Sequence, residues 1–174
     1  MSDQSRSATI NGWLDTAFSR SGLNHNDISP WLGSELSVAI PASALSSLTP
    51  RAGASSSSSP DVTVLIASKD DAKAQAALDK FRSGLVGRAE QWTTSAHDGV
   101  TVTSATGNGS GGAYAIANHT VIFASNSGAA DAVIDTAHGK RANLLSSDSF
   151  KTVEAQLPTD RLGLIYMDVP ALVR

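Results

Sequence analysis

Apolar residues recur along the chain with the helical spacing of three and four in four segments. The first covers residues 10–18, and the second begins after Ser68 and ends near Gly84. The last two cover residues 127–137 and 147–157. Each segment presents one apolar stripe, so we predict four amphipathic helices that pack on a common core. Ser68, Ser127 and Ser147 are the predicted N-terminal caps of the last three helices.

Other segments alternate between apolar and polar residues, or form short apolar runs, as strands do. The predicted strands are residues 35–41, 61–67, 90–95, 100–106, 113–117, 120–124 and 161–169. Asn118 and His119 separate two of these strands, which predicts a tight hairpin. His97, Asp98 and Gly99 precede another strand and are interpreted as a turn.

The predicted elements occur in the order α, β, β, α, β, β, β, β, α, α, β. Connections of two to six residues join antiparallel neighbours, because a parallel pair needs a crossover of about a dozen residues or more. The fold class is therefore predicted as α+β, with a largely antiparallel sheet and helices packed on one face.

The chain has 174 residues, which is enough for one domain with a core of its own. Residues 46–60 consist mostly of Ser, Pro, Gly and Ala, and include five consecutive serines, a composition typical of a flexible loop. We interpret this stretch as a loop within a single domain, residues 1–174. An apolar stretch follows the last predicted strand directly, so we expect the chain to be a fragment of a longer protein.

Charge and composition exclude several classes of function. The net charge is −3, with 13 basic and 16 acidic residues, and residues 89–139 contain neither Lys nor Arg. A nucleic-acid partner is therefore not expected, because such proteins place a basic excess on the phosphates. The chain has no Cys, which excludes disulfides, thiol nucleophiles and Cys-ligated metals.

The chain begins with a polar segment and lacks the apolar core of a signal peptide. Its longest apolar runs are residues 62–67 and 162–167. Both are far too short to span a bilayer as a helix. We expect a soluble chain whose membrane contact, if it has any, depends on an anchor outside this sequence.

Three residues form a candidate metal site. Asp131, Asp135 and His138 recur at helical spacing, which places three ligand types on one face of the predicted helix. The alternative is a solvated polar face, because these residues lie opposite the stripe of Val133 and Ile134. Amphipathic helices carry such faces routinely, so the solvated face is the favoured interpretation, and no cofactor is expected.

Two further motifs have conventional interpretations. Residues 107–112 match the glycine pattern of dinucleotide-binding loops, but a strand follows them where that motif requires a helix, so a hairpin loop is favoured. Trp92 lies in a polar strand and is a candidate aromatic contact, or else closes one end of the helix layer. Trp13 and Trp31 fall on apolar patterns and are assigned to the core. No serine-hydrolase motif occurs.

Residues 29–36 read Ser-Pro-Trp-Leu-Gly-Ser-Glu-Leu and resemble a motif of the bacterial domain-of-unknown-function family 3352. The resemblance extends over about residues 22 to 172. It includes the strand and helix of residues 61–78, the tyrosine-bearing hairpin of residues 113–124 and the helix start at 146–150. Residues 157–168 are similar to the Leu-Pro-x-Asp strand that begins the family's units. The resemblance implies an uncharacterised extracytoplasmic domain, often tethered by an N-terminal membrane helix that this chain lacks.

These observations favour a non-enzymatic structural or interaction module of an extracytoplasmic bacterial protein. Two alternatives stay open. A sheet covered by helices can hold a lipid-like apolar ligand between its layers. A hydrolase without a recognisable motif is the second alternative.

Overall fold

The structure is a computed structural model that describes residues 22–41, 61–85, 91–106 and 111–157, together with Leu164 and Tyr166. Several predicted features lie outside the described residues: the helix at 10–18 with Trp13, the loop at 46–60, most of the glycine-rich motif at 107–112, and most of the strand at 161–169.

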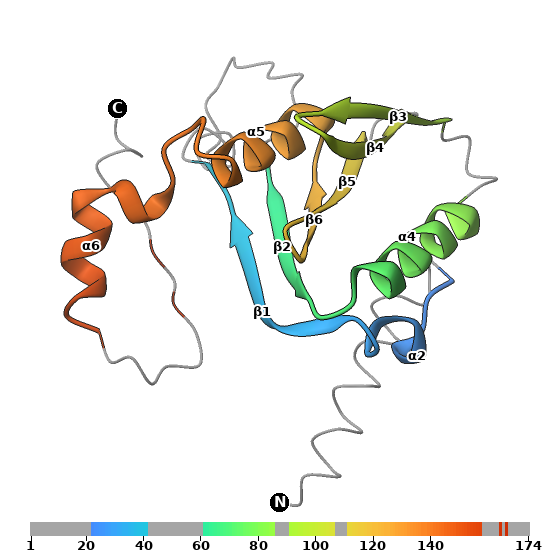
Figure 1. Ribbon diagram of the computed structural model, residues 1–174, viewed down its shortest axis with the longest axis horizontal. Coiled ribbons are helices and arrows are strands. Elements are labelled where there is room, and N and C mark those ends of the chain that lie inside the picture. Colours follow the sequence, from blue (N-terminus) through green and yellow to red (C-terminus); the bar gives the residue numbers. More distant parts are fainter. Residues whose placement is uncertain are drawn as a thin grey trace, which may run out of the picture.

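The described chain forms six strands with helical segments before, between and after them (Figure 1). In order these are α2 (His25–Ile28), β1 (Leu32–Ala39), β2 (Thr63–Ser68), α4 (Asp71–Leu85), β3 (Gln91–His97), β4 (Val100–Thr106), β5 (Gly112–Ala117), β6 (Thr120–Ala124), α5 (Ser127–Ala137), the 3-10 turn η2 (Leu144–Ser146) and α6 (Asp148–Glu154).

All six strands belong to one sheet in the order β1-β2-β6-β5-β4-β3, and every neighbouring pair is antiparallel. This confirms the predicted α+β class and antiparallel sheet. The two short hairpins have the predicted turns: φ is positive at Asn118 (48°) and His119 (57°), and at Asp98 (51°) and Gly99 (82°). Positive φ at both central residues is typical of the type I′ turn, whose twist matches that of the flanking strands.

The helices lie on both faces of the sheet, and this refines the expectation that they pack on one face. Successive side chains of a strand point to opposite faces. In β5, Tyr114 and Ile116 belong to the cluster that contains residues of α2 and α4, whereas Ala113 and Ala115 belong to the cluster that contains α5. The amphipathic patterns of α4 and α5 each require an apolar partner, and the two faces of the same strands supply one each.

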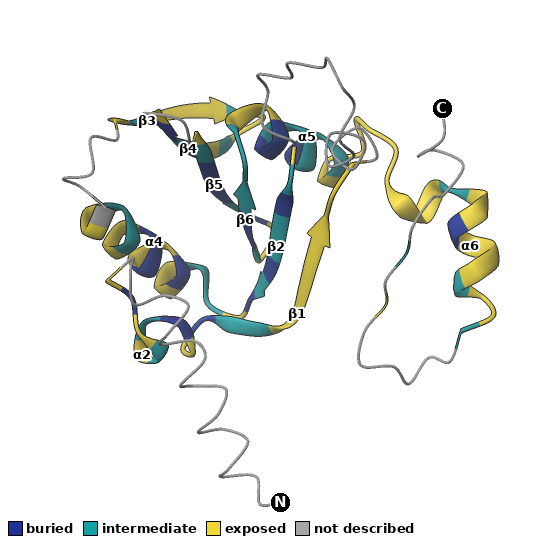
Figure 2. Ribbon diagram, turned by 180° about the vertical axis from the view of Figure 1, so that it is seen from behind, coloured by how far each residue is buried: buried dark blue, intermediate teal, exposed yellow. Residues whose placement is uncertain are grey.

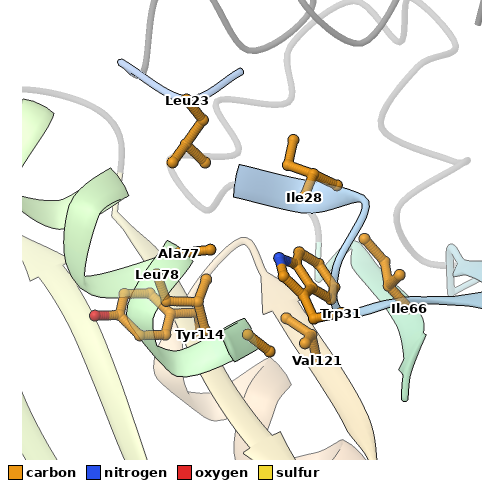
Figure 3. Close-up of a cluster of buried hydrophobic side chains, with 9 residues drawn as sticks. Leu23, Ile28, Trp31, Ile66, Ala77, Leu78, Tyr114 and Val121 are labelled. Carbon is orange, nitrogen blue, oxygen red and sulfur yellow. The ribbon is translucent and has the colours of Figure 1, made fainter. Parts of the chain in front are cut away.

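The first core cluster lies between α2, α4 and the sheet (Figure 3). Trp31, predicted to be in the core, is 4% exposed and lies beside Ile28, Ile66 and Val121. Its indole Nε1 donates a hydrogen bond to the Asp27 carbonyl at 2.9 Å. The polar end of the ring is thereby satisfied while its apolar body is removed from water.

The second core cluster lies between α5 and the opposite face of the sheet. Ile134 and Ala130 of α5 and Val102 of β4 are each 0% exposed, and Ile122 of β6 is 1% exposed. Small residues dominate this face of β5, which lets α5 approach the strands closely.

Two of the three predicted helix caps are replaced by a neighbouring residue with a longer side chain. Asp70 Oδ1, not Ser68, accepts from the third backbone amide of α4, at 3.1 Å from Lys73 N. Asn126 caps α5 in the same way, at 2.8 Å from Ala129 N. Ser147 caps α6 as predicted. Asp and Asn cap helices as well as Ser does, so the capping chemistry was predicted but not its position.

Within the described residues, no helix is long and apolar enough to cross a membrane.

Candidate functional site

The tip of the β3–β4 hairpin is joined to the C-terminal end of α5 by two His–Asp contacts. His97, the last residue of β3, places Nε2 2.8 Å from Oδ1 of Asp135. Its Nδ1 lies 3.8 Å from Oδ1 of Asp131, one helical turn earlier. Both carboxylates come from the α5 face that the sequence predicted them to share.

At the next residue, Asp98, the roles are exchanged: the hairpin supplies the carboxylate, and the end of α5 and the residues after it supply the basic side chains. Asp98 Oδ2 contacts Nδ1 of His138, the C-terminal cap of α5, and Asp98 Oδ1 lies 2.7 Å from Nζ of Lys140. The hairpin therefore contributes one base and one acid, and α5 with the residues that follow it contributes their partners. Asp98 has a left-handed backbone conformation (φ 51°). The consecutive side chains of His97 and Asp98 each reach their own partners from this turn.

These contacts shift the protonation of the groups that form them. The hydrogen bond that the His97 ring makes to the Asp135 carboxylate is the main cause that raises the pKa of His97, with Asp131 and Asp135 also contributing by charge. Lys140 and then His138 lower the pKa of Asp98 to about 2. Both shifts favour the charged forms of His97 and Asp98, and the contacts of these two residues fasten the hairpin to α5 and Lys140.

The candidate metal ligands Asp131, Asp135 and His138, for which a solvated helix face was the favoured interpretation, take part in different contacts. Asp131 and Asp135 face His97, whereas His138 turns to Asp98. Among the described residues, no group of three or more His, Asp or Glu side chains is arranged to hold a metal ion. Sequence reasoning found the shared helix face but missed His97 and Asp98, whose only signal was a His-Asp pair in a turn.

Trp92 is half-buried in a group of aromatic rings at the β3 end of the sheet. Its ring centroid lies 6.4 Å from that of Phe81 in α4, edge to face, and 5.9 Å from that of Tyr114. Phe81 in turn meets Phe123 edge to face at 6.4 Å. The structure thus places this candidate contact residue against the first core cluster, at one end of the layer formed by α4.

Two hollows lie on the surface of the described residues, and charged or polar side chains contribute to the lining of both. The first, of about 300 Å³, lies between α2 and α4 and is lined by Asp27, Lys73 and Lys80 among others. The second, of about 170 Å³, lies over β1, β2 and β6 beside Glu35 and Thr120. Neither lies between the sheet and a helix layer, where the lipid-binding alternative places its ligand.

Among the described strands, β1 forms one edge of the sheet and carries exposed apolar side chains. Three large apolar side chains on and just after β1 are exposed: Leu36 by 65%, Val38 by 54% and Ile40 by 47% (Figure 2). Leu36 and Val38 pair with Ile66 and Val64 of β2, so they continue the face that carries the first core cluster beyond its covering helices. The alternating pattern predicts a strand here but does not indicate that it is an edge.

The fold and this surface define an α+β protein with an open antiparallel sheet, helices on both faces and an apolar edge strand. A family model described as "Protein of unknown function (DUF3352)" matches residues 3–174, and the chain belongs to this family. No protein of curated function and no solved structure matches the chain.

Proposed function

We propose that this chain is a non-enzymatic structural unit of an extracytoplasmic bacterial protein, and that it joins a further segment of polypeptide by accepting a strand at the β1 edge. The single observation that carries this proposal is the exposed apolar stripe of Leu36, Val38 and Ile40 on an open edge strand.

An edge strand presents a row of unpaired backbone N–H and C=O groups to any chain that approaches it. Soluble proteins blunt such edges with charged residues, prolines or bulges. In β1 the register shifts between Leu32 and Leu36, but the pairing from Leu36 to Ala39 is regular. Glu35 is the one charged residue of β1, so its regular half has no charge to oppose pairing.

The apolar stripe adds a side-chain contact to these backbone groups. Strand addition combines main-chain hydrogen bonds with contacts from alternate side chains. Leu36, Val38 and Ile40 alternate in this way, and burying them against a further strand or helix removes apolar area from water, which stabilises the contact.

The remaining parts of the proposal have separate support. The His97 and Asp98 contacts fasten a hairpin to a helix, which gives these titratable side chains a structural role. The proposed extracytoplasmic location is supported by the sequence resemblance alone, which implies such a domain.

Amide hydrogen exchange of the full chain, resolved by residue with NMR, tests strand acceptance. The amides of β1 that point away from β2 are expected to exchange slowly, because a strand covers them. Val38→Lys should accelerate their exchange at least about tenfold, since it puts a charge into the apolar contact. Ser37→Lys is the matched control, because Ser37 is also exposed but lies on the opposite face, and it should leave the exchange unchanged.

Rapid exchange of these amides in the unmodified chain would contradict the proposal. Equal effects of Val38→Lys and Ser37→Lys would also contradict it, because the apolar stripe would then have no special part in the contact.

A further inference from the structure

We infer that the strand accepted by β1 is the chain's own segment 161–169, which docks along the β1 edge together with α6 and extends the sheet to a seventh strand. This inference rests on the proposed function and names the partner of the same surface.

The exposed large apolar side chains of the described residues fall into two groups. The first group is the β1 stripe defined above. The second group lies on η2, α6 and the segment after it: Leu144 (50% exposed), Leu145 (63%), Val153 (45%) and Leu164 (39%). Neither η2 nor α6 contributes to the two core clusters of the sheet. Each group is therefore an apolar surface that the described residues leave exposed, and contact between them would bury both.

Tyr166, one of the two described residues of the segment, makes an aromatic contact with α6. The ring of Tyr166 meets that of Phe150 edge to face, with centroids 5.1 Å apart and an interplanar angle of 88°. Phe150, the α6 partner in this contact, is buried at 6% exposure. In both ribbon views α6 lies on the β1 side of the sheet, away from β3 (Figures 1 and 2).

The segment and β1 have the same dipeptides at their two ends. Leu32-Gly33 begins β1 and Pro41-Ala42 follows it, and in the same way Leu162-Gly163 precedes a strand pattern that ends at Pro170-Ala171. Gly33 shows why glycine is needed at this point: a Cβ there would lie 2.7 Å from the carbonyl oxygen of Ala67 in β2. A strand that starts with the same Leu-Gly step is suited to a similarly close approach to a neighbouring strand.

Length and charge fit pairing with β1. The segment is only slightly longer than β1, so as an extended strand it would run along the whole edge. Residues 162–167 carry no charge, and both sets of alternate positions in the segment are largely apolar. With Tyr166 held against α6, the set that includes Leu164 would continue the stripe of Leu36 and Val38, and α6 would cover it.

Connectivity favours the chain's own segment over a foreign strand. Residues 125–160 link the sheet to the segment through α5 and α6, so docking is an intramolecular closure. The entropic cost of such a closure grows only slowly with the length of the connection. A tethered segment is also present at an effective concentration in the millimolar range, which a free partner rarely reaches.

The test substitutes Ile165→Pro in the full chain, because proline removes an amide donor from the middle of the segment and is incompatible with a central strand. Thr159→Pro is the matched control, since it adds a proline just before the segment. The measurement is again the exchange of the β1 amides that face away from β2, with the oligomeric state determined by light scattering. Slow exchange of β2 and β6 amides verifies that each variant is folded.

We expect Ile165→Pro to accelerate exchange of the β1 edge amides at least about tenfold, Thr159→Pro to leave it unchanged, and all forms to be monomeric. Leu164→Lys is a second variant with the same expected effect, should the proline variant fail to fold. Slow exchange of β1 in both Ile165→Pro and Leu164→Lys would overturn this inference while strand acceptance at β1 stands. A dimer that Ile165→Pro converts to a monomer would assign the strand to a second copy and overturn docking within one chain. Rapid exchange in the unmodified chain would overturn the proposed function itself.

Discussion

At the scale of single residues, the tip of the β3–β4 hairpin shows how two consecutive side chains fix a tertiary contact. His97 reaches two carboxylates of α5, and Asp98 reaches a histidine and a lysine at the end of the same helix. The four partner side chains are between 26% and 53% exposed, so solvent screens the contacts and each is individually weak. The contacts fix orientation more than they add stability, because the hairpin matches both of its side chains to their partners in only one position on the helix.

The pH dependence of the two contacts runs in opposite directions. The pKa of His97 is raised above its ordinary 6.5, so its stabilising effect is complete below 6.5 and is lost as pH rises through the raised pKa. The pKa of Asp98 is lowered from 3.8 to about 2, so its stabilising effect is complete above 3.8 and is lost as pH falls through about 2. Both contacts are fully formed only between these limits, from about pH 4 to 6.5.

An NMR titration of the His97 ring protons tests the assignment of partners. Asp135→Asn should lower the pKa of His97 toward 6.5, because it removes the charge of the carboxylate that lies 2.8 Å from Nε2. Asp131→Asn should lower the pKa less, since that carboxylate lies 3.8 Å from the ring and forms no hydrogen bond with it. Ser95→Ala, in the same strand, is the control and should leave the pKa unchanged. A larger effect of Asp131→Asn would show that the contacts are wrongly assigned.

This cluster marks the limit of prediction at the residue scale. Helical spacing placed Asp131, Asp135 and His138 on one face, and the Asp131 and Asp135 contacts of α5 agree with that placement. Spacing within one helix carries no information about which loop packs against it, so His97 and Asp98 were not assigned as partners. A hairpin turn and a helix end that are distant in sequence meet only through the order of strands in the sheet.

At the scale of elements, local sequence patterns predict the hairpin turns, but they do not predict which distant strands pair or which face of the sheet each helix covers. The Asn-His and Asp-Gly turns define their hairpins because residues that tolerate positive φ occur there between alternating segments. The position of β1 at the sheet edge depends on β2 pairing with β6, a strand far along the chain, and no local pattern records that pairing. For the same reason α5 was expected beside the other helices, whereas its apolar stripe packs on the opposite face.

Gly33 provides a test at this scale, because β1 and β2 approach each other closely there. A Cβ at Gly33 would lie 2.7 Å from the Ala67 carbonyl oxygen and 2.9 Å from the Ala67 Cβ, so the strands must separate to admit it. Gly33→Ala should therefore destabilise the chain by about 1 to 3 kcal/mol, as measured by urea unfolding. Gly111→Ala is the matched control, because a Cβ there has one neighbour at 3.4 Å. Its effect should stay below about 1 kcal/mol. Equal effects of the two substitutions would contradict the close approach of β1 and β2.

At the scale of the whole molecule, one sheet carries two cores that share backbone but not side chains. β5 and β6 contribute alternate residues to each cluster, so neither helix layer can form without the strands that the other also uses. We expect this shared backbone to make the described strands and helices unfold as one cooperative unit, even though α4 and α5 lie on opposite faces. The β1 edge is the exception, because its exposed stripe lies beyond the reach of both layers.

A double-mutant cycle tests this arrangement. Ile28→Val lies in the first cluster and Ile134→Val in the second, and each should lower the free energy of unfolding by about 0.5 to 1.5 kcal/mol. Because the two sites share no side-chain partner, the double variant should equal the sum to within about 0.5 kcal/mol, with a single unfolding transition. Ile122→Val combined with Ile134→Val is the comparison pair, since both residues belong to the second cluster and are free to couple. If the coupling energy of Ile28 and Ile134 exceeds that of the comparison pair, the two clusters form a single core and the proposed arrangement is wrong. If unfolding shows two separate transitions, the shared strands do not make the two helix layers unfold as one unit.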